Sequence, residues 1–237
     1  AAFAAVVGMA WWMLFAMPGE SYRDPLPPMS EAQIALRERL RDHVEQLADT
    51  IGERNIDRYD ALLEAERYVI VQFEAFGYTI ERQAFEVGGH EVANIEAQRD
   101  GSGEIVIIGA HYDSAPLCPG ANDNATGVAA LLELARDFAD QQPGRTLRFV
   151  AFVNEEPPHF QTADMGSMHY AARCRERGEN IVAMIAMDGL GCYLDEPGTQ
   201  EYPLPVEFAY PSQGDFISMT GNLSSRSLLH RAIGSFR

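Results

Sequence analysis

The sequence predicts an α/β fold in which helices cover both faces of a mostly parallel central sheet. Three continuous apolar runs indicate the sheet, at residues 104–109, 146–153 and 181–187. Such runs are typical of strands that are buried on both faces. Two segments with helical periodicity, residues 125–139 and 166–177, separate the runs. This alternation favours parallel pairing, because each helix returns the chain to the same edge of the sheet.

The chain before the first apolar run predicts two helices and a β-hairpin. The helices are expected at residues 30–48 and 57–76, where apolar residues recur every three or four positions. Residues 78–87 and 91–97 have the pattern of strands, and the pair Gly88-Gly89 between them favours a tight turn.

Three segments are expected along the chain. Residues 1–18 form an apolar segment, residues 19–30 a proline-containing linker, and residues 31–237 the folded domain. The domain should close with an amphipathic helix at residues 224–236, after which no strand follows. We therefore expect the fold to be incomplete at its C-terminus.

The apolar segment 1–18 carries no charge and includes Trp11 and Trp12. An uncleaved membrane anchor is favoured over a signal peptide, because paired Trp suits a membrane interface and Ala16-Met17-Pro18 is a poor cleavage site. A buried core helix is the third alternative. With an anchor, we expect the domain outside the cytoplasm, in the periplasm or at the cell surface. With a cleaved signal peptide, the protein would be secreted.

The composition excludes several classes of function. The 35 acidic residues against 18 basic ones give a net charge of −17, which repels phosphate backbones, so we expect no nucleic-acid partner. All basic residues are Arg, so the sequence has neither a P-loop lysine nor a Schiff-base lysine. The 3 Cys are widely spaced and form no C-x-x-C pair, which argues against a thiolate zinc site or a disulfide framework.

Imidazole and carboxylate side chains follow each of the three apolar runs. His111 and Asp113 follow the first, Glu155 and Glu156 the second, and Asp188 the third. Ligand sites in open α/β sheets lie at the carboxyl ends of the strands. The fold prediction therefore brings these side chains together at one edge of the sheet.

A sixth side chain, Asp123, is expected in the loop that enters the helix capped by Asn124. Each of these short segments, taken alone, also has a purely structural interpretation. The tripeptide around Asp123 suits a turn and a helix cap, and Glu155-Glu156 suits a solvated strand end. Together, however, these segments follow successive predicted strands at the same edge of the sheet, and this arrangement favours a functional site.

Clustered carboxylates repel one another unless a cation lies between them. An imidazole with carboxylates, and without thiolate, suits Zn²⁺ or a similar divalent ion, and Asp123 is placed to bridge two such ions. Because Glu155 and Glu156 are adjacent, they should point to opposite sides of an extended segment. One would bind metal while the other faces the reacting water as a general base, which is the combination that a hydrolase needs.

Five segments resemble the co-catalytic di-zinc exopeptidases, a family that includes bacterial leucyl aminopeptidases and glutamate carboxypeptidases. The resemblance spans about residues 32–236. The matching segments are GAHYDS (109–114), PGANDNATGVAALLELAR (119–136), NEEPP (154–158), MGSMHYA (165–171) and MDGLGCY (187–193).

The resemblance implies a role for each site residue. The zinc ligands would be His111, Asp123, Glu156 and Asp188, with Asp123 bridging the two ions. Glu155 would be the general base, and Asp113 would accept the second N–H of His111 and so orient its ring.

The family's second zinc takes a final His ligand from a late loop, and no residue of this chain matches it. His230 matches a helix of the family, His169 lies in the predicted helix 166–177, and His159 suits the rim of the site better than a ligand position. We therefore expect a chain that lacks the C-terminal part of the domain. On its own, such a chain should bind one zinc more firmly than two.

The expected function is a zinc-dependent exopeptidase with peptide substrates. Aminopeptidase action is favoured, with hydrolysis of N-terminal residues through a metal-bridging hydroxide and Glu155 as the base. One alternative is a single-zinc acyltransferase that resembles a glutaminyl cyclase, against which the Glu155-Glu156 pair argues. The other is a non-catalytic binding module on the same fold.

Overall fold

The computed structural model describes residues 6, 8–9, 11–12, 25–204, 206–208 and 210–236. The chain divides into two compact units, Met29–Cys192 and a second unit made of Ala1–Pro28 and Tyr193–Arg237. Residues 193–237, which we expected to be part of the catalytic domain, fall in the second unit.

The proposed anchor and linker, residues 1–30, lie largely outside the described residues. Within the part of the chain that is described, every helix is too short or too polar to cross a membrane.

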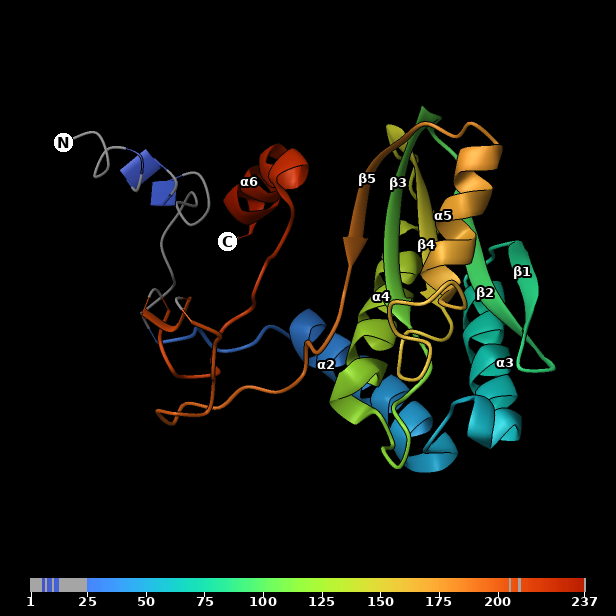
Figure 1. Ribbon diagram of the computed structural model, residues 1–237, viewed down its shortest axis with the longest axis horizontal. Helices are drawn as coiled ribbons and strands as arrows, with labels where there is room; N and C mark the ends of the chain where they lie inside the picture. The colour runs from blue at the N-terminus through green and yellow to red at the C-terminus, as the bar shows by residue number, and fades with distance from the viewer. Residues whose placement is uncertain are drawn as a thin grey trace. The chain divides into compact units, whose positions relative to one another are not determined.

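The larger unit is built on a five-stranded mixed sheet with the order β1-β2-β4-β3-β5 (Figure 1). The strands are β1 (Ile80–Val87), β2 (His90–Arg99), β3 (Ser102–His111), β4 (Arg145–Phe152) and β5 (Ile181–Ala186). β3 pairs in parallel with both β4 and β5. The predicted hairpin is confirmed as β1 and β2, which pair antiparallel, and β2 is also antiparallel to β4. The α/β class is thus confirmed, with the parallel strands together on one side of the sheet.

Helices cover both faces of this sheet (Figure 1). They are α2 (Glu31–Val44), which continues as the π-helical turn η1 (Glu45–Ile51), the short 3-10 helix η2 (Ile56–Arg58), α3 (Tyr59–Ala75), α4 (Thr126–Phe138) and α5 (Gly166–Glu176). Ser30 begins α2 as predicted, because its hydroxyl accepts from the Gln33 N–H while the Gln33 side chain accepts from the Ser30 N–H.

The core has two layers, one on each face of the sheet. On one face, Leu62 of α3 and Leu131 of α4 are buried against β2 and β4. On the other face, Tyr170 and Cys174 of α5 cover Val150 and its neighbours on β3 and β4. Each fully buried Leu or Phe contributes about 1.5–3 kcal/mol of hydrophobic free energy, so this packing holds the strand ends in place.

The prediction that residues 181–187 form a fully buried strand was wrong. β5 lies at the edge of the described sheet, and Val182, Met184 and Ile185 are each about two-fifths exposed. An edge strand has a neighbour on one side only, so an apolar sequence by itself cannot distinguish it from a central strand.

Charged side chains are buried beneath α5. The guanidinium of Arg148 donates to both oxygens of Glu179, over 2.7 Å and 2.8 Å. Hydrogen bonding to Arg148 is the main reason why the pKa of Glu179 is lowered from 4.5 to about 2. Because the pKa is lower in the folded state, this pair stabilises the fold above about pH 4.5, and its contribution is lost as the pH falls towards 2.

Replacing Glu179 with Gln should therefore lower the free energy of unfolding at pH 7 by roughly 1–3 kcal/mol. The difference from the parent chain should shrink below pH 4.5, where the parent carboxylate begins to be protonated on unfolding. Urea unfolding across this pH range measures the effect. The exposed Glu176 of α5, changed to Gln, is the control and should change stability by less than about 0.5 kcal/mol. A constant difference at all pH values would contradict the assignment.

The second unit contains little regular structure among its described residues. It has the short helices η4 (Val206–Phe208) and η5 (Leu223–Ser225), an isolated bridge between Leu194 and Gly214, and α6 (Arg226–Ser235). The helix predicted at residues 224–236 is thus confirmed as η5 and α6.

Candidate metal centre

His111 is the last residue of β3, and its side chain is almost fully buried. The next residue, Tyr112, is held in the core by a hydrogen bond from its hydroxyl to the Ala93 carbonyl, which fixes the exit direction of the chain. The His111 Nε2 atom lies 3.0 Å from an Asp123 oxygen, 3.8 Å from Asp188 and 3.9 Å from Glu155. Even so, neither ring nitrogen has a hydrogen-bond partner of proper geometry among the described residues.

Asp113 connects His111 with the segment after β4. One of its carboxylate oxygens lies 3.4 Å from Nδ1 of His111. The same carboxylate accepts the backbone N–H groups of Glu155 and Glu156, over 3.2 Å and 3.1 Å. This second function was not predicted, because backbone contacts leave no trace in the side-chain pattern.

The chain changes direction after β4 at Asn154, directly before Glu155 and Glu156. Asn154 adopts φ = 57°, a left-handed conformation that Asn tolerates better than most residues. The turn lets both carboxylates reach the site, with Glu155 near His111 and Glu156 among the candidate ligands.

Asp123 lies in the turn η3 (Ala121–Ala125) that leads into α4. The next side chain, the buried amide of Asn124, accepts the Gly127 N–H of the first turn of α4 at 3.0 Å, while the residue at the capping position is Ala125 rather than the predicted Asn124. The same amide donates to the Met187 carbonyl at 2.9 Å, directly before Asp188. Asn124 therefore ties Asp123 to the end of β5, where Asp188 approaches His111.

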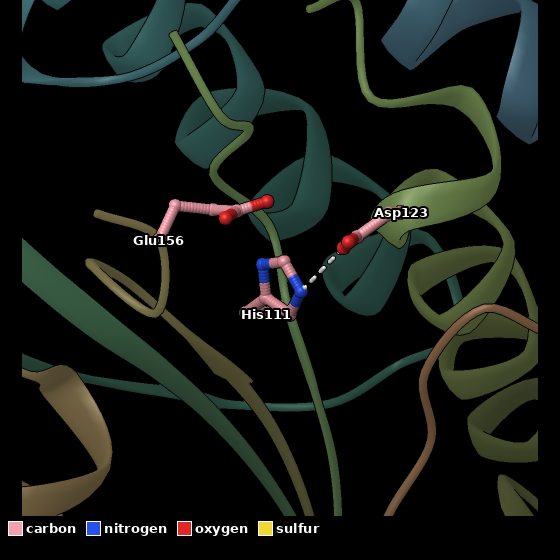
Figure 2. A group of neighbouring side chains, drawn as sticks. All are labelled: His111, Asp123 and Glu156. Carbon is pink, nitrogen blue, oxygen red and sulfur yellow. Dashed lines mark ion pairs between the residues drawn. The ribbon is translucent and has the colours of Figure 1, made fainter. Parts of the chain in front are cut away.

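Three of the predicted ligands form one compact group. Ligand atoms of His111, Asp123 and Glu156 all lie within 4.8 Å of one another. Figure 2 shows the three side chains pointing towards one another from different segments of the chain. Asp188 and Glu155 lie within 4 Å of Nε2 of His111, and Asp113 lies near Nδ1. The structure therefore brings all six predicted site residues together.

The electrostatics of the group indicate a place for a cation. Burial lowers the pKa of His111, but Asp113, Asp123 and Asp188 outweigh burial and raise it to about 12. Burial, with Asp113, Glu156 and Asp188, raises the pKa of Glu155 to about 7. Burial and the neighbouring Asp123 also raise the pKa of Glu156. The carboxylates thus favour positive charge at this position, which a divalent ion supplies better than a proton.

The residues present fit zinc. A buried imidazole without a hydrogen-bond partner, surrounded by carboxylates and without thiolate, is a donor set that Zn²⁺ prefers. Asp123 and Asp188 are more than half exposed, so an ion can reach the group from solvent.

Three other histidines of the larger unit have different contacts. His159 lies 3.9 Å from Asp164, His169 stacks on Phe85, and His43 contacts Tyr68 and Glu133 in the core.

One nearby residue that sequence reasoning missed is Arg54, which is fully buried close to the loop between β3 and α4. The only signal for it is an arginine outside the two predicted helices, in a segment without apolar periodicity. Such a position suits a surface turn equally well.

Gly127 allows α4 to approach the end of β5. A Cβ at this position would lie 2.2 Å from the Asn124 amide oxygen and 2.5 Å from the Met187 carbonyl oxygen. Gly127→Ala should therefore separate the two elements and destabilise the fold by about 1–3 kcal/mol, as measured by urea unfolding. Gly144→Ala, where a Cβ would have open space, is the control and should be nearly neutral. Equal stability of the two variants would show that this close approach is not required.

The fold and the site together define an α/β protein with a candidate metal centre at the carboxyl edge of its sheet. Residues 92–206 match the model of Peptidase family M28. The resemblance to the di-zinc exopeptidases is thereby confirmed.

The chain is similar to longer proteins. It is 38% identical over 196 residues to the YfbL protein of Escherichia coli strain K12, covering 78% of this chain and 60% of that protein. Among solved structures, BSAP, a zinc aminopeptidase from Bacillus subtilis, is 14% identical with a TM-score of 0.58, covering 69% of this chain and 71% of that one. The glutaminyl cyclase of Fimbriiglobus ruber is 21% identical with a TM-score of 0.56, covering 74% and 67%. At these identities, the two structures establish the fold alone.

Proposed function

We propose that the protein is a zinc-dependent exopeptidase that acts as an aminopeptidase on peptides. The observation that carries the proposal is the convergence of His111, Asp123 and Glu156, whose ligand atoms lie within 4.8 Å of one another. The match of residues 92–206 to a peptidase family supports the same reaction class.

His111, Asp123, Glu156 and Asp188 would hold the metal. Zinc, when bound, supplies a Lewis acid and lowers the pKa of water. Glu155 takes a proton from the attacking water and delivers it to the nitrogen of the leaving amine. Asp113 holds the backbone of Glu155 and lies beside Nδ1 of His111, so it orients the base and a ligand together.

The charge of the protein favours the amino end of a peptide. The net charge of −17 attracts an ammonium group and repels a terminal carboxylate, within the screening length of about 8 Å at physiological salt. This argues for aminopeptidase rather than carboxypeptidase action.

A second candidate is glutaminyl cyclisation, because the Fimbriiglobus ruber protein that shares this fold is a glutaminyl cyclase. In that reaction the α-amine attacks the side-chain amide carbon of the same residue, the bond from that carbon to the amide nitrogen breaks, and ammonia leaves without consumption of water. A base beside the reacting nitrogen would serve either reaction, so the two are distinguished by their products.

The test uses protein stripped of metal and then titrated with zinc. We expect the loaded protein to hydrolyse leucine p-nitroanilide and to leave its N-acetyl derivative intact, because acetylation removes the ammonium group. Turnover of the acetylated compound alone would contradict aminopeptidase action. Conversion of a glutaminyl peptide to its cyclic product without hydrolysis would favour the second candidate. Zinc that binds without any turnover would favour the binding module.

For the apolar residues 1–18 we propose a membrane anchor that places the domain outside the cytoplasm. The absence of charge in this segment supports the proposal. The whole protein should then require detergent for extraction. Release without detergent after export would favour a cleaved signal peptide.

A further inference from the structure

Arg54 lies between η1 and η2 and is fully buried, with an exposed fraction of 0%. Burial of a guanidinium is costly unless all of its N–H groups find acceptors. Its acceptors should therefore show what the residue does.

The guanidinium donates to five backbone carbonyls. Two of them, Leu47 at 3.2 Å and Gly52 at 3.1 Å, belong to the segment that carries Arg54. The other three belong to the loop between β3 and α4, and they are Tyr112 at 2.7 Å, Pro119 at 2.5 Å and Gly120 at 2.9 Å.

These three carbonyls stand at the two ends of the loop. Tyr112 directly follows the ligand His111, and Gly120 directly precedes the turn η3 that carries Asp123. One planar group therefore sets the separation of the two ends. Backbone contacts add to this connection, because Ser114 N–H donates to the Arg54 carbonyl at 2.9 Å and the Ser114 hydroxyl accepts the Arg54 N–H at 3.1 Å.

The loop is shaped closely around this arginine. Gly120 has φ = 61°, and a Cβ there would lie 3.0 Å from the Arg54 guanidinium and 2.6 Å from the Ser114 side chain. Glycine is required at this position both for its backbone conformation and for the lack of space.

Arg54 also brings charge to the site. Among the described residues, Arg54 forms no ion pair within 4 Å, so no carboxylate in direct contact neutralises its charge. Burial lowers its pKa to about 10, while Asp113, Asp123 and Glu156 are among the groups that oppose this effect. The guanidinium therefore remains positive at neutral pH and offsets part of the repulsion within the acidic group.

We propose that Arg54 is a positioning residue of the metal centre, which holds the 112–124 loop so that His111 and Asp123 stand in ligand geometry before the metal binds. The inference rests on the proposed zinc site and goes beyond it, since Arg54 touches neither metal nor substrate. Lysine cannot replace it, because an ammonium has three N–H groups at one nitrogen and cannot satisfy all five carbonyls that the planar guanidinium reaches.

A purely structural role would affect stability alone, so the test measures zinc affinity separately. The variant is Arg54→Lys. The matched control is Arg148→Lys, because Arg148 is also a buried arginine but binds carboxylates beneath α5. The zinc dissociation constant is measured by competition with a chromophoric chelator, and circular dichroism verifies the fold of each protein.

We expect Arg54→Lys to weaken zinc binding by about 10–100-fold, which is the range seen when support of a ligand is lost. Arg148→Lys should lower the melting temperature and leave the zinc affinity within about 3-fold of the parent chain, since its contacts are not shared with the site. Unchanged zinc affinity in folded Arg54→Lys would overturn the inference and leave the proposed zinc site standing. A parent chain that binds no zinc would overturn both.

Should Arg54→Lys not fold, Ser114→Ala provides the second variant. It removes the hydroxyl that accepts the Arg54 N–H and donates to the Cys118 carbonyl at 2.9 Å. A weakening of zinc binding by at least about 3-fold, in a folded protein, would support the positioning role of this contact. Parent-like zinc affinity would overturn it.

Discussion

Glu155→Gln should reduce peptide hydrolysis by about 10²–10⁴-fold while zinc binding stays intact. The amide is nearly the same size as the carboxylate but cannot accept a proton from water. The backbone N–H of Glu155 still reaches Asp113, so the turn after β4 should keep its shape. The measurement pairs the rate of leucine p-nitroanilide hydrolysis with zinc content per chain.

The matched control for this variant is Glu104→Gln. Glu104 is an exposed glutamate near the start of β3, at the opposite end of the strand from His111. Its rate and zinc content should equal those of the parent chain. A parent-like rate in Glu155→Gln would exclude Glu155 as the base. Loss of zinc together with the rate would mean that Glu155 is a ligand instead.

Asp123→Ala should abolish measurable zinc binding at micromolar metal. Asp123 is the carboxylate closest to Nε2 of His111, at 3.0 Å, and we propose it as a metal ligand. The loss should exceed the 10–100-fold range that follows removal of a supporting residue, because a ligand itself is removed. Hydrolysis should fall to the background rate, and calorimetric zinc titration measures the binding directly.

Folding should survive this change, since the Asp123 side chain is 59% exposed and exposed ion pairs contribute little to stability. Asp164→Ala, at an exposed aspartate beside His159, is the control and should bind zinc as the parent chain does. Tight zinc binding by Asp123→Ala would show that the metal is held by a different set of residues.

The order and type of the main elements followed from local patterns. Apolar periodicity placed α3, α4 and α5, and the pair Gly88-Gly89 placed the hairpin turn between β1 and β2. These signals are local, because a helix or a hairpin is formed by residues that are close in the sequence.

Strand neighbours were harder to predict. The apolar run at residues 181–187 has the composition of a central strand, but β5 is an edge strand of the described sheet. An edge strand differs from a central strand in the number of strands that pair with it. The neighbouring strands are distant in the sequence, so the local pattern does not show them. The same reason explains why β2 lies antiparallel to β4, an arrangement that alternation of strands and helices does not reveal.

For the site, the sequence by itself determined which residue types follow the strands. Side chains at the carboxyl ends of the strands come directly after the apolar runs in the sequence, so they can be identified from it. His111 and the pair Glu155-Glu156 could be selected in this way, whereas the choice of Asp123 and Glu156 as ligands came from the resemblance to the di-zinc exopeptidases. Only the tertiary structure decided how they are held: the Asn154 turn that turns both glutamates to the site, the Asp113 contacts with two backbone N–H groups, and the Arg54 contacts with the loop carbonyls. These contacts and this turn involve backbone atoms, which every residue possesses. A pattern of side chains in the sequence therefore could not predict them.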